Sequence, residues 1–134
     1  MATEFQNEAL ARDFVTRCLR ALDARDYETL ANGFASDGVW ARGGEHLVGP
    51  EAVRAAMAKR PAGLETQHLA SNMVVDSQGA DAATVSYTIA AYAQTVEQAW
   101  HLHGLFRAVD QLTRTAAGWR FVHRAIEPAF SVRN

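Results

Sequence analysis

His68 is the residue of this sequence best suited to acid–base chemistry. It lies in the segment 66–74, whose apolar end (residues 73–75) and the turn-forming residues 76–79 beyond it predict a strand that enters a turn. Side chains two apart in a strand share a face, so His68 and Asn72 are expected to point the same way. An imidazole and a carboxamide on one face suit a pocket, although a lone histidine or asparagine in a strand is more often a surface or core residue.

Asp23 is the carboxylate that could complete a proton-transfer pair with His68. It follows Leu22 at the inner end of a predicted amphipathic helix, where a buried carboxylate would need a partner. A carboxylate bonded to one ring nitrogen fixes the tautomer of a histidine and makes its other nitrogen a better base. The sequence leaves equally open that Asp23 faces solvent at the end of the helix.

Other kinds of reactive site have little support in the sequence. His101 and His103 could share a strand face, but no cysteine or carboxylate cluster joins them, so we predict no metal site. Gly43-Gly44 lacks the lysine and serine of a phosphate loop, and no cofactor is expected. Cys18, the single cysteine, lies in a helical pattern without an activating neighbour and is expected to pack in the core.

The composition is that of one globular domain, expected to span residues 1–134. Hydrophobic residues make up 49% and charged residues 21% of the chain, and the net charge of -2 comes from interspersed acids and bases. No basic run predicts binding to nucleic acid or to a membrane surface, and no apolar run approaches the roughly 20 residues that span a bilayer. The single cysteine and the lack of a signal-peptide pattern predict a cytoplasmic protein.

Helical periodicity in the first half of the chain gives way to strand periodicity in the second. Helices are predicted over residues 4–24, 27–34 and 49–60, with Asp26 as a cap and Pro50 in the first turn, and a short strand is predicted over 39–41. Extended segments are predicted over residues 65–76, 81–97, 98–114 and 118–128. Helices followed by long antiparallel strands predict an α+β fold, with the helices packed on one face of a curved sheet.

Several short motifs, taken in order, resemble the SnoaL-like branch of the nuclear-transport-factor-2-like superfamily over nearly the whole chain. These motifs are Leu22–Tyr27, Phe34–Trp40, Gly49–Val53, His68–Asn72 and Gly118–Phe121. The resemblance implies a cone-shaped α+β barrel, in which helices pack on a strongly bent mixed sheet and enclose an apolar pocket. It also implies a homodimer or homotrimer.

Two enzymes of this superfamily, scytalone dehydratase and hexachlorocyclohexane dehydrochlorinase, remove a proton with a histidine–aspartate pair. Asp23 and His68 match the two positions of that pair. Trp40 matches a pocket tryptophan of the dehydrochlorinase, and Arg124 falls near a pocket residue there. Cys18 replaces a lysine of the dehydrochlorinase, and Leu22 replaces a substrate-binding tyrosine of the dehydratase, so neither enzyme's own substrate is expected.

The sequence therefore predicts a cofactor-independent enzyme, of the dehydratase/lyase or isomerase/cyclase type, acting on an apolar or aromatic ring-containing metabolite. His68 would be the general base, and Asp23 would orient it and stabilise the imidazolium. The predicted substrate contacts are Trp40, Tyr27, Asn72, Tyr92, Phe106 and Arg124. The alternative is a non-catalytic ligand-binding or assembly module related to the small subunit of ring-hydroxylating dioxygenases, in which Asp23 and His68 would be a structural pair.

Overall fold

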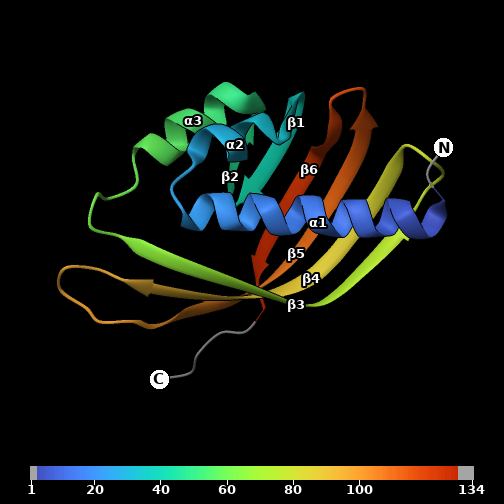
Figure 1. Ribbon diagram of the computed structural model, residues 1–134. Coiled ribbons are helices and arrows are strands. Elements are labelled where there is room, and N and C mark those ends of the chain that lie inside the picture. The colour runs from blue at the N-terminus through green and yellow to red at the C-terminus, as the bar shows by residue number, and fades with distance from the viewer. Residues whose placement is uncertain (1–2, 130–134) are drawn as a thin grey trace.

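A strongly curved six-stranded sheet wraps around one long helix in the computed structural model, which describes residues 3–129. Helix α1 (Glu4–Asp23) crosses the concave face of the sheet, and the short helices α2 (Tyr27–Asn32) and α3 (Gly49–Ala58) cover one end of it (Figure 1). The strands are β1 (Phe34–Arg42), β2 (Glu45–Val48), β3 (Glu65–Ser77), β4 (Ala82–Gln94), β5 (His101–Thr115) and β6 (Gly118–Pro128).

The sheet is mixed and open. Its strand order is β2-β1-β6-β5-β4-β3, with β1 parallel to β6 and every other neighbouring pair antiparallel. The predicted α+β fold with helices on one face of a bent mixed sheet is confirmed. The sheet does not close into a full barrel, because β2 and β3 remain its two edges.

Strand β1 is longer than predicted, and strand β2 was not predicted. Residues 36–38 have turn-like composition, yet they lie inside β1, at an irregularity in its pairing with β6. Gly38 is required there because a Cβ atom would collide with the backbone oxygen of Phe121. Strand β2 has only four residues and follows the Gly43-Gly44 turn, so its sequence pattern is too short to be recognised.

Helix α1 begins and ends with complete capping motifs. Thr3 and Gln6 form a capping box at its start. At its end, the backbone N–H of Asp26 bonds to Ala21 O at 2.8 Å, and the N–H of Arg25 bonds to Leu22 O at 3.2 Å. This is the Schellman arrangement, and Arg25 occupies its left-handed position with φ 59°. The motif fixes the direction of the chain immediately after Asp23.

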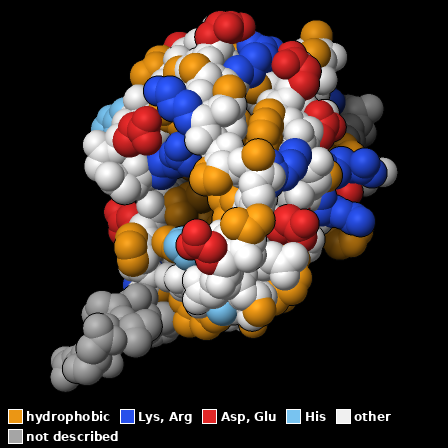
Figure 2. All heavy atoms as spheres, turned by 90° about the vertical axis from the view of Figure 1, so that its left-hand side faces the viewer, with side chains coloured by type: hydrophobic (Ala, Val, Ile, Leu, Met, Phe, Trp, Pro, Cys, Tyr) orange, Lys and Arg blue, Asp and Glu red, His pale blue; other side chains and the backbone are white. Residues whose placement is uncertain are grey.

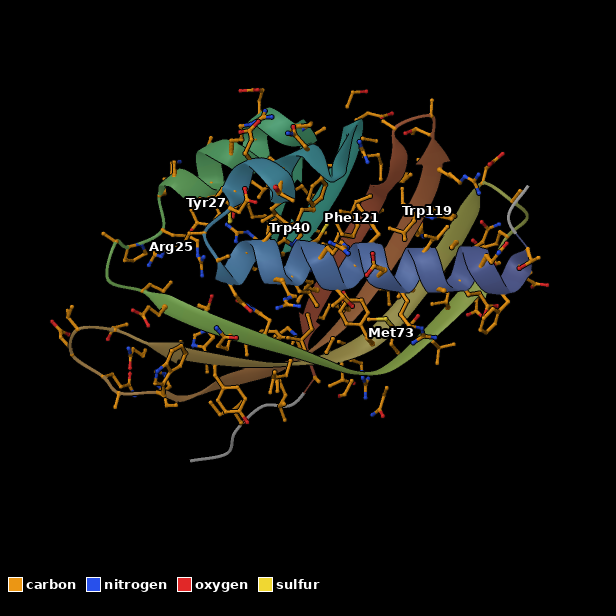
Figure 3. All side chains as sticks on the ribbon, in the orientation of Figure 1. Arg25, Tyr27, Trp40, Met73, Trp119 and Phe121 are labelled. Atoms are coloured by element: carbon orange, nitrogen blue, oxygen red, sulfur yellow. The ribbon has the colours of Figure 1, made fainter. Side chains whose placement is uncertain are left out.

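The buried stripe of α1 packs on an aromatic cluster from β1 and β6. Phe14 of α1 lies 4.9 Å from Phe121, which lies 4.9 Å from Phe34, and Phe34 stacks on Trp40 at 5.9 Å, all between ring centroids. Figure 3 shows Trp40 and Phe121 just above α1 in this view, near β1 and β6, with Tyr27 above the C-terminal end of α1. Offset aromatic pairs of this kind stabilise a core beyond the area they bury. The cluster ends at Trp40, where a cavity begins.

None of the helices described within residues 3–129 is both long enough and apolar enough to cross a membrane.

Candidate active site

A cavity of about 270 Å3 lies between helix α1 and the concave face of the sheet. It opens at the end of the molecule where α3, the start of β3 and the β4–β5 hairpin meet, and Figure 2 shows this hollow with hydrophobic side chains inside it. Its lining is mostly apolar: Leu19, Leu22, Trp40, Met57, Leu64, Ile89, Ala91, Ala93, Phe106 and Ile126. Its polar lining consists of Arg42, Arg60, Thr66, His68, His103 and Arg124.

Asp23 and His68 form a direct hydrogen-bonded pair at the wall of this cavity. His68 Nδ1 lies 2.5 Å from Asp23 Oδ1, and the backbone N–H of His68 donates to Asp23 Oδ2 at 2.8 Å. The Thr66 hydroxyl donates to Asp23 Oδ1 at 3.0 Å. The two side chains retain only 10% (Asp23) and 17% (His68) of their exposure, so the pair is largely shielded from solvent. The structure thus brings together the two residues that the sequence suggested as partners.

The pair is held from both sides by local structure. Asp23 is the last residue of α1, where the Schellman motif turns the chain. The guanidinium of Arg25 then donates to the backbone oxygens of Pro61, Ala62 and Leu64, in the loop that leads into β3. Because Thr66 and His68 lie at the start of β3, this contact fixes them relative to the end of α1.

The hydrogen bonds determine the state of each partner. Burial by itself raises the pKa of Asp23, but the bonds from the His68 ring and backbone and from Thr66 outweigh burial and hold that pKa below its usual value. The ionised carboxylate can only accept, so the Nδ1 atom of His68 must carry the shared proton. In neutral His68 the other ring nitrogen, Nε2, is then the basic atom, and no residue within 3–129 hydrogen-bonds to it.

Arg60 connects the pair to Tyr27. Its guanidinium donates to the Tyr27 hydroxyl at 2.9 Å and to the Thr66 hydroxyl at 3.2 Å, and it lies 5.7 Å from the centre of the Tyr27 ring. Tyr27 packs against the hydrophobic core and does not line the cavity. It is therefore placed to hold Arg60 rather than to touch a ligand.

Asn72 lies on the other side of β3 from the cavity, so the expected common face with His68 is wrong. A β-bulge between Ser71 and Val74 places two residues opposite one, and Asn72 adopts φ 54° within it. The inward-facing positions change there from Thr66 and His68 to the odd-numbered positions 73, 75 and 77. Asn72 instead lines an outer depression on the sheet.

Tyr92 is also outside the cavity. Alternate residues of β4, from Ala83 to Ala93, are buried, which puts Tyr92 on the outer face with 36% of its surface exposed. Ala91 and Ala93 take the cavity-facing positions beside it. Small side chains at these two positions leave room that a tyrosine would fill.

Trp40, Phe106 and Arg124 line the cavity, but Arg124 cannot contact a ligand directly. Its side chain is fully buried, 5.1 Å from the ring centres of both Trp40 and Phe121, and all three guanidinium nitrogens are covered. Asp110 faces it across the β5–β6 ladder, with 3.7 Å between Arg124 Nε and Asp110 Oδ1. The predicted polar contact between Arg124 and a substrate oxygen would need the side chain to move.

Asp110 belongs to a second polar group beneath the cavity. Its Oδ2 accepts a hydrogen bond of 2.5 Å from the Tyr87 hydroxyl, while no described residue bonds to its Oδ1 or to the nitrogens of Arg124. Burial raises the pKa of Asp110, against the opposing effect of Arg124. Burial also raises the pKa of the nearby Cys18 thiol to about 12, which fits its predicted packing role.

Sequence reasoning missed four polar residues that line the cavity: Arg42, Arg60, Thr66 and His103. Arg42 is the last residue of β1, and Arg60 follows α3. Both line the cavity only because β1 and α3 meet at its mouth. His103 is the extra residue of a second bulge, between Ala91 and Tyr92 of β4 and their partners in β5. The spacing Thr66-Gln67-His68 was a usable signal, because residues two apart in a strand share a face.

The comparisons with known proteins agree with this fold. A model of the SnoaL-like domain matches residues 4–125. Similar solved structures include an NTF2-like protein with a cystatin-like fold from Novosphingobium aromaticivorans, at TM-score 0.77 and 23% identity, covering 96% of this chain and 85% of that one. ActVI-ORFA from Streptomyces coelicolor is similar at TM-score 0.78 and 16% identity, with coverages of 90% and 96%.

A third similar structure, a protein from Catenulispora acidiphila in complex with S-DNPA, has TM-score 0.76 and 21% identity, with coverages of 90% and 91%. At such identities the likeness concerns the fold alone. Among curated proteins, none matches the sequence. The family model, however, covers nearly the whole chain, and its family includes polyketide cyclases and proteins related to ring-hydroxylating enzymes. This protein belongs to the SnoaL-like domain family.

Proposed function

We propose that the protein is a cofactor-independent enzyme that removes a proton from a carbon atom of an apolar, ring-containing molecule. The observation that carries this proposal is the 2.5 Å bond between Asp23 Oδ1 and Nδ1 of His68, whose side chain lines a mostly apolar cavity. The bond fixes the tautomer in which Nε2 is the basic nitrogen. An oriented base of this kind contributes roughly 10²–10⁴-fold to the rate of a proton transfer.

The reaction step follows from the chemistry of the pair. His68 Nε2 takes the proton as the carbon–hydrogen bond breaks, and the electron pair moves into an adjacent carbonyl group to form an enolate. Asp23 stabilises the imidazolium that forms. Return of the proton to another carbon gives an isomer, and loss of a hydroxyl group as water, with the proton from His68, gives a dehydrated product. Family membership supports the enolate-forming step, because polyketide cyclases belong to this family.

A first test measures proton exchange without knowledge of the natural substrate. 2-Tetralone, a two-ring ketone with acidic protons beside its carbonyl group, is incubated with the protein in D2O, and the loss of those protons is followed by 1H NMR. We expect wild type to accelerate exchange and His68→Ala to abolish the acceleration. His46→Ala, which removes an exposed histidine of β2, is the matched control. Equal exchange by wild type and His68→Ala would contradict the role of His68 as the base.

A second test examines the pair itself. Two-bond 1H–15N NMR spectra of the histidine rings identify the nitrogen that carries the proton, and we expect the Nδ1–H form of neutral His68 in wild type. The Asp23→Asn variant should lose this preference, because a carboxamide can also donate. An Nε2–H form in wild type would leave Nδ1, which faces Asp23, as the only basic nitrogen of the ring, and would favour the non-catalytic alternative.

We also propose that the protein forms a homodimer or homotrimer through the outer face of its sheet. This face exposes apolar side chains of four strands: Leu69, Val74, Tyr92, Leu102, Val109 and Val122. Apolar side chains exposed in this number on one sheet face are typical of protein–protein contacts. Light scattering that gave the mass of one chain, 14.6 kDa, would contradict the proposal.

A further inference from the structure

We propose that the cavity takes a ring-sized, apolar carboxylate, with its ring in the interior and its carboxylate bound by Arg42 and Arg60 at the mouth. The inference rests on the proposed function in treating this cavity as the substrate site, and it adds the charge and the orientation of the ligand. It is carried by the sign of the charges in the lining and by the position of the two arginines.

The charges that line the cavity have one sign. Its charged side chains are those of three arginines, and none of the acidic residues described within 3–129 lines it. The chain as a whole carries a net charge of -2, so this is a local accumulation against the overall balance. The acid nearest the lining, Asp23, is engaged by three hydrogen bonds. A pocket lined in this way favours an anion and raises the rate at which anions enter it.

Arg42 and Arg60 mark the boundary between the cavity and solvent. Both line the cavity, and both also line an open groove outside it, together with Lys59 and Glu45. Glu45 is the one acid of that groove, and its Oε2 lies 3.7 Å from Arg42 Nε. The two terminal nitrogens of Arg42 have no hydrogen-bond partner among residues 3–129, which leaves the edge of the guanidinium that suits a carboxylate.

The other basic groups indicate why the carboxylate belongs at the mouth. The nitrogens of Arg124 are covered by protein, so a carboxylate deep in the cavity would lose its water without gaining a direct bond to this residue. The interior offers aromatic and aliphatic surface from Trp40, Ile89 and Phe106. A ring buries most apolar area when it lies against these side chains, whereas a carboxylate at the mouth keeps part of its hydration.

This orientation places the ligand beside the proposed base. Arg60 donates to the Thr66 hydroxyl, which in turn donates to Asp23, so the proposed carboxylate site is two hydrogen bonds from the Asp23–His68 pair. The cavity of about 270 Å3 is near the lower end of the roughly 300–1,000 Å3 typical of ligand pockets, which indicates a molecule of one or two rings.

The test uses two probes of equal shape and different charge. Calorimetric titration of wild type with 2-naphthoate and with neutral 2-naphthamide should show tighter binding of naphthoate, by about tenfold at low salt. Added salt should reduce the difference, because part of the attraction is screened. Equal affinities, tighter binding of the amide, or no binding of naphthoate at millimolar concentration would overturn the proposal.

Variants at the mouth locate the anion. Arg42→Gln and Arg60→Gln should each lower the naphthoate affinity severalfold and leave the naphthamide affinity unchanged. Lys59→Gln is the matched control, since Lys59 lines the outer groove but not the cavity. An equal loss with Lys59→Gln would show a general effect of surface charge and would contradict the proposal. Arg60→Lys, which retains the charge, should recover part of the affinity.

The same titrations in His68→Ala separate this inference from the proposed function. Naphthoate should remain preferred in that variant, because the carboxylate site does not include His68. A preserved preference together with unchanged exchange of 2-tetralone protons would refute proton abstraction by His68 while supporting the anion site. Accelerated exchange in wild type without any preference for naphthoate would support proton abstraction and refute the anion site.

Discussion

Two carboxylates within residues 3–129, those of Asp23 and Asp110, face inward beside a basic residue, but their surroundings differ. Asp23, at the wall of the cavity, accepts three hydrogen bonds, two of them from His68. Asp110, beneath the cavity floor, accepts one bond from Tyr87 and lies 3.7 Å from Arg124 without bonding to it. Both have a basic neighbour, yet the pKa of Asp23 is lowered and that of Asp110 is raised.

The difference shows that hydrogen bonds to the charged form, rather than the presence of a basic neighbour, decide the direction in which the pKa of each carboxylate shifts. Burial opposes ionisation of both, and more strongly for the fully buried Asp110. Only Asp23 has enough donors to bring its pKa below the usual value. Asp23 is thereby fitted to stabilise an imidazolium, whereas the Asp110–Arg124 pair contributes mainly to the arrangement of the core.

The largest effect is expected from His68→Ala, which removes the proposed base. Acceleration of proton exchange should fall roughly 10²–10⁴-fold, because the oriented nitrogen is lost. Rates of 2-tetralone exchange measured by NMR check this, with thermal unfolding to show that the variant is folded. Tyr87→Phe removes the hydrogen bond to the other carboxylate, Asp110. An equal loss of proton exchange in this variant would remove the distinction between the two carboxylates.

Arg124→Met should cause the largest loss of stability. It leaves Asp110 buried without its cationic neighbour, and such a break costs about 3–5 kcal/mol of the free energy of unfolding. Adding Asp110→Asn should recover most of that loss, because no buried charge then remains. Urea unfolding of the two single variants and the double variant measures this. Additive losses would mean that the two groups do not interact.

Asp23→Asn should produce a smaller loss of stability that depends on pH. Because the pKa of Asp23 is lowered by folding, its contribution is complete above the usual value of 3.8 and disappears as the pH falls through the folded value. We expect a loss of about 1–2 kcal/mol near neutral pH, allowing for partial exposure. The difference in free energy of unfolding between wild type and variant should shrink below about pH 4. A gap that stays constant down to pH 2 would contradict the assigned shift.

The smallest effect is expected at Asn72. Asn72→Ala should cost about 1 kcal/mol, because alanine tolerates the left-handed conformation less well, while Asn72→Gly should be close to neutral. Thermal unfolding compares the two. Neither variant should change the affinity for 2-naphthoate, since Asn72 faces away from the cavity. A change in affinity would restore Asn72 to the site.

Local patterns in the sequence predicted the helices and the four long strands. The residues alone left the partner of Asp23 open, and the resemblance to SnoaL-like proteins indicated His68. Prediction from the sequence failed where the alternation of inward- and outward-facing residues in a strand is interrupted or was wrongly applied. At Asn72 the bulge shifts the alternation by one, and nothing in the flanking pattern announces it. Tyr92 could have been excluded, because the alternation through Val85, Tyr87 and Ile89 already assigns it to the outer face. The place of Arg42 and Arg60 in the site could not be predicted, because it depends on how β1 and α3 meet in three dimensions.

The bulge in β3 also divides that strand into two independent parts. Before the bulge, Thr66 and His68 line the cavity; after it, Met73 and Val75 pack in the hydrophobic core, and the extra residue lets each part keep its own alternation. Substitutions before the bulge can therefore reshape the ligand site while Met73 and Val75 keep their packing in the core. A single-residue deletion at position 72 would force both parts into one alternation, so that either His68 or Val75 would turn outward. The chain can thus vary its chemistry on one half of a strand while its folding depends on the other.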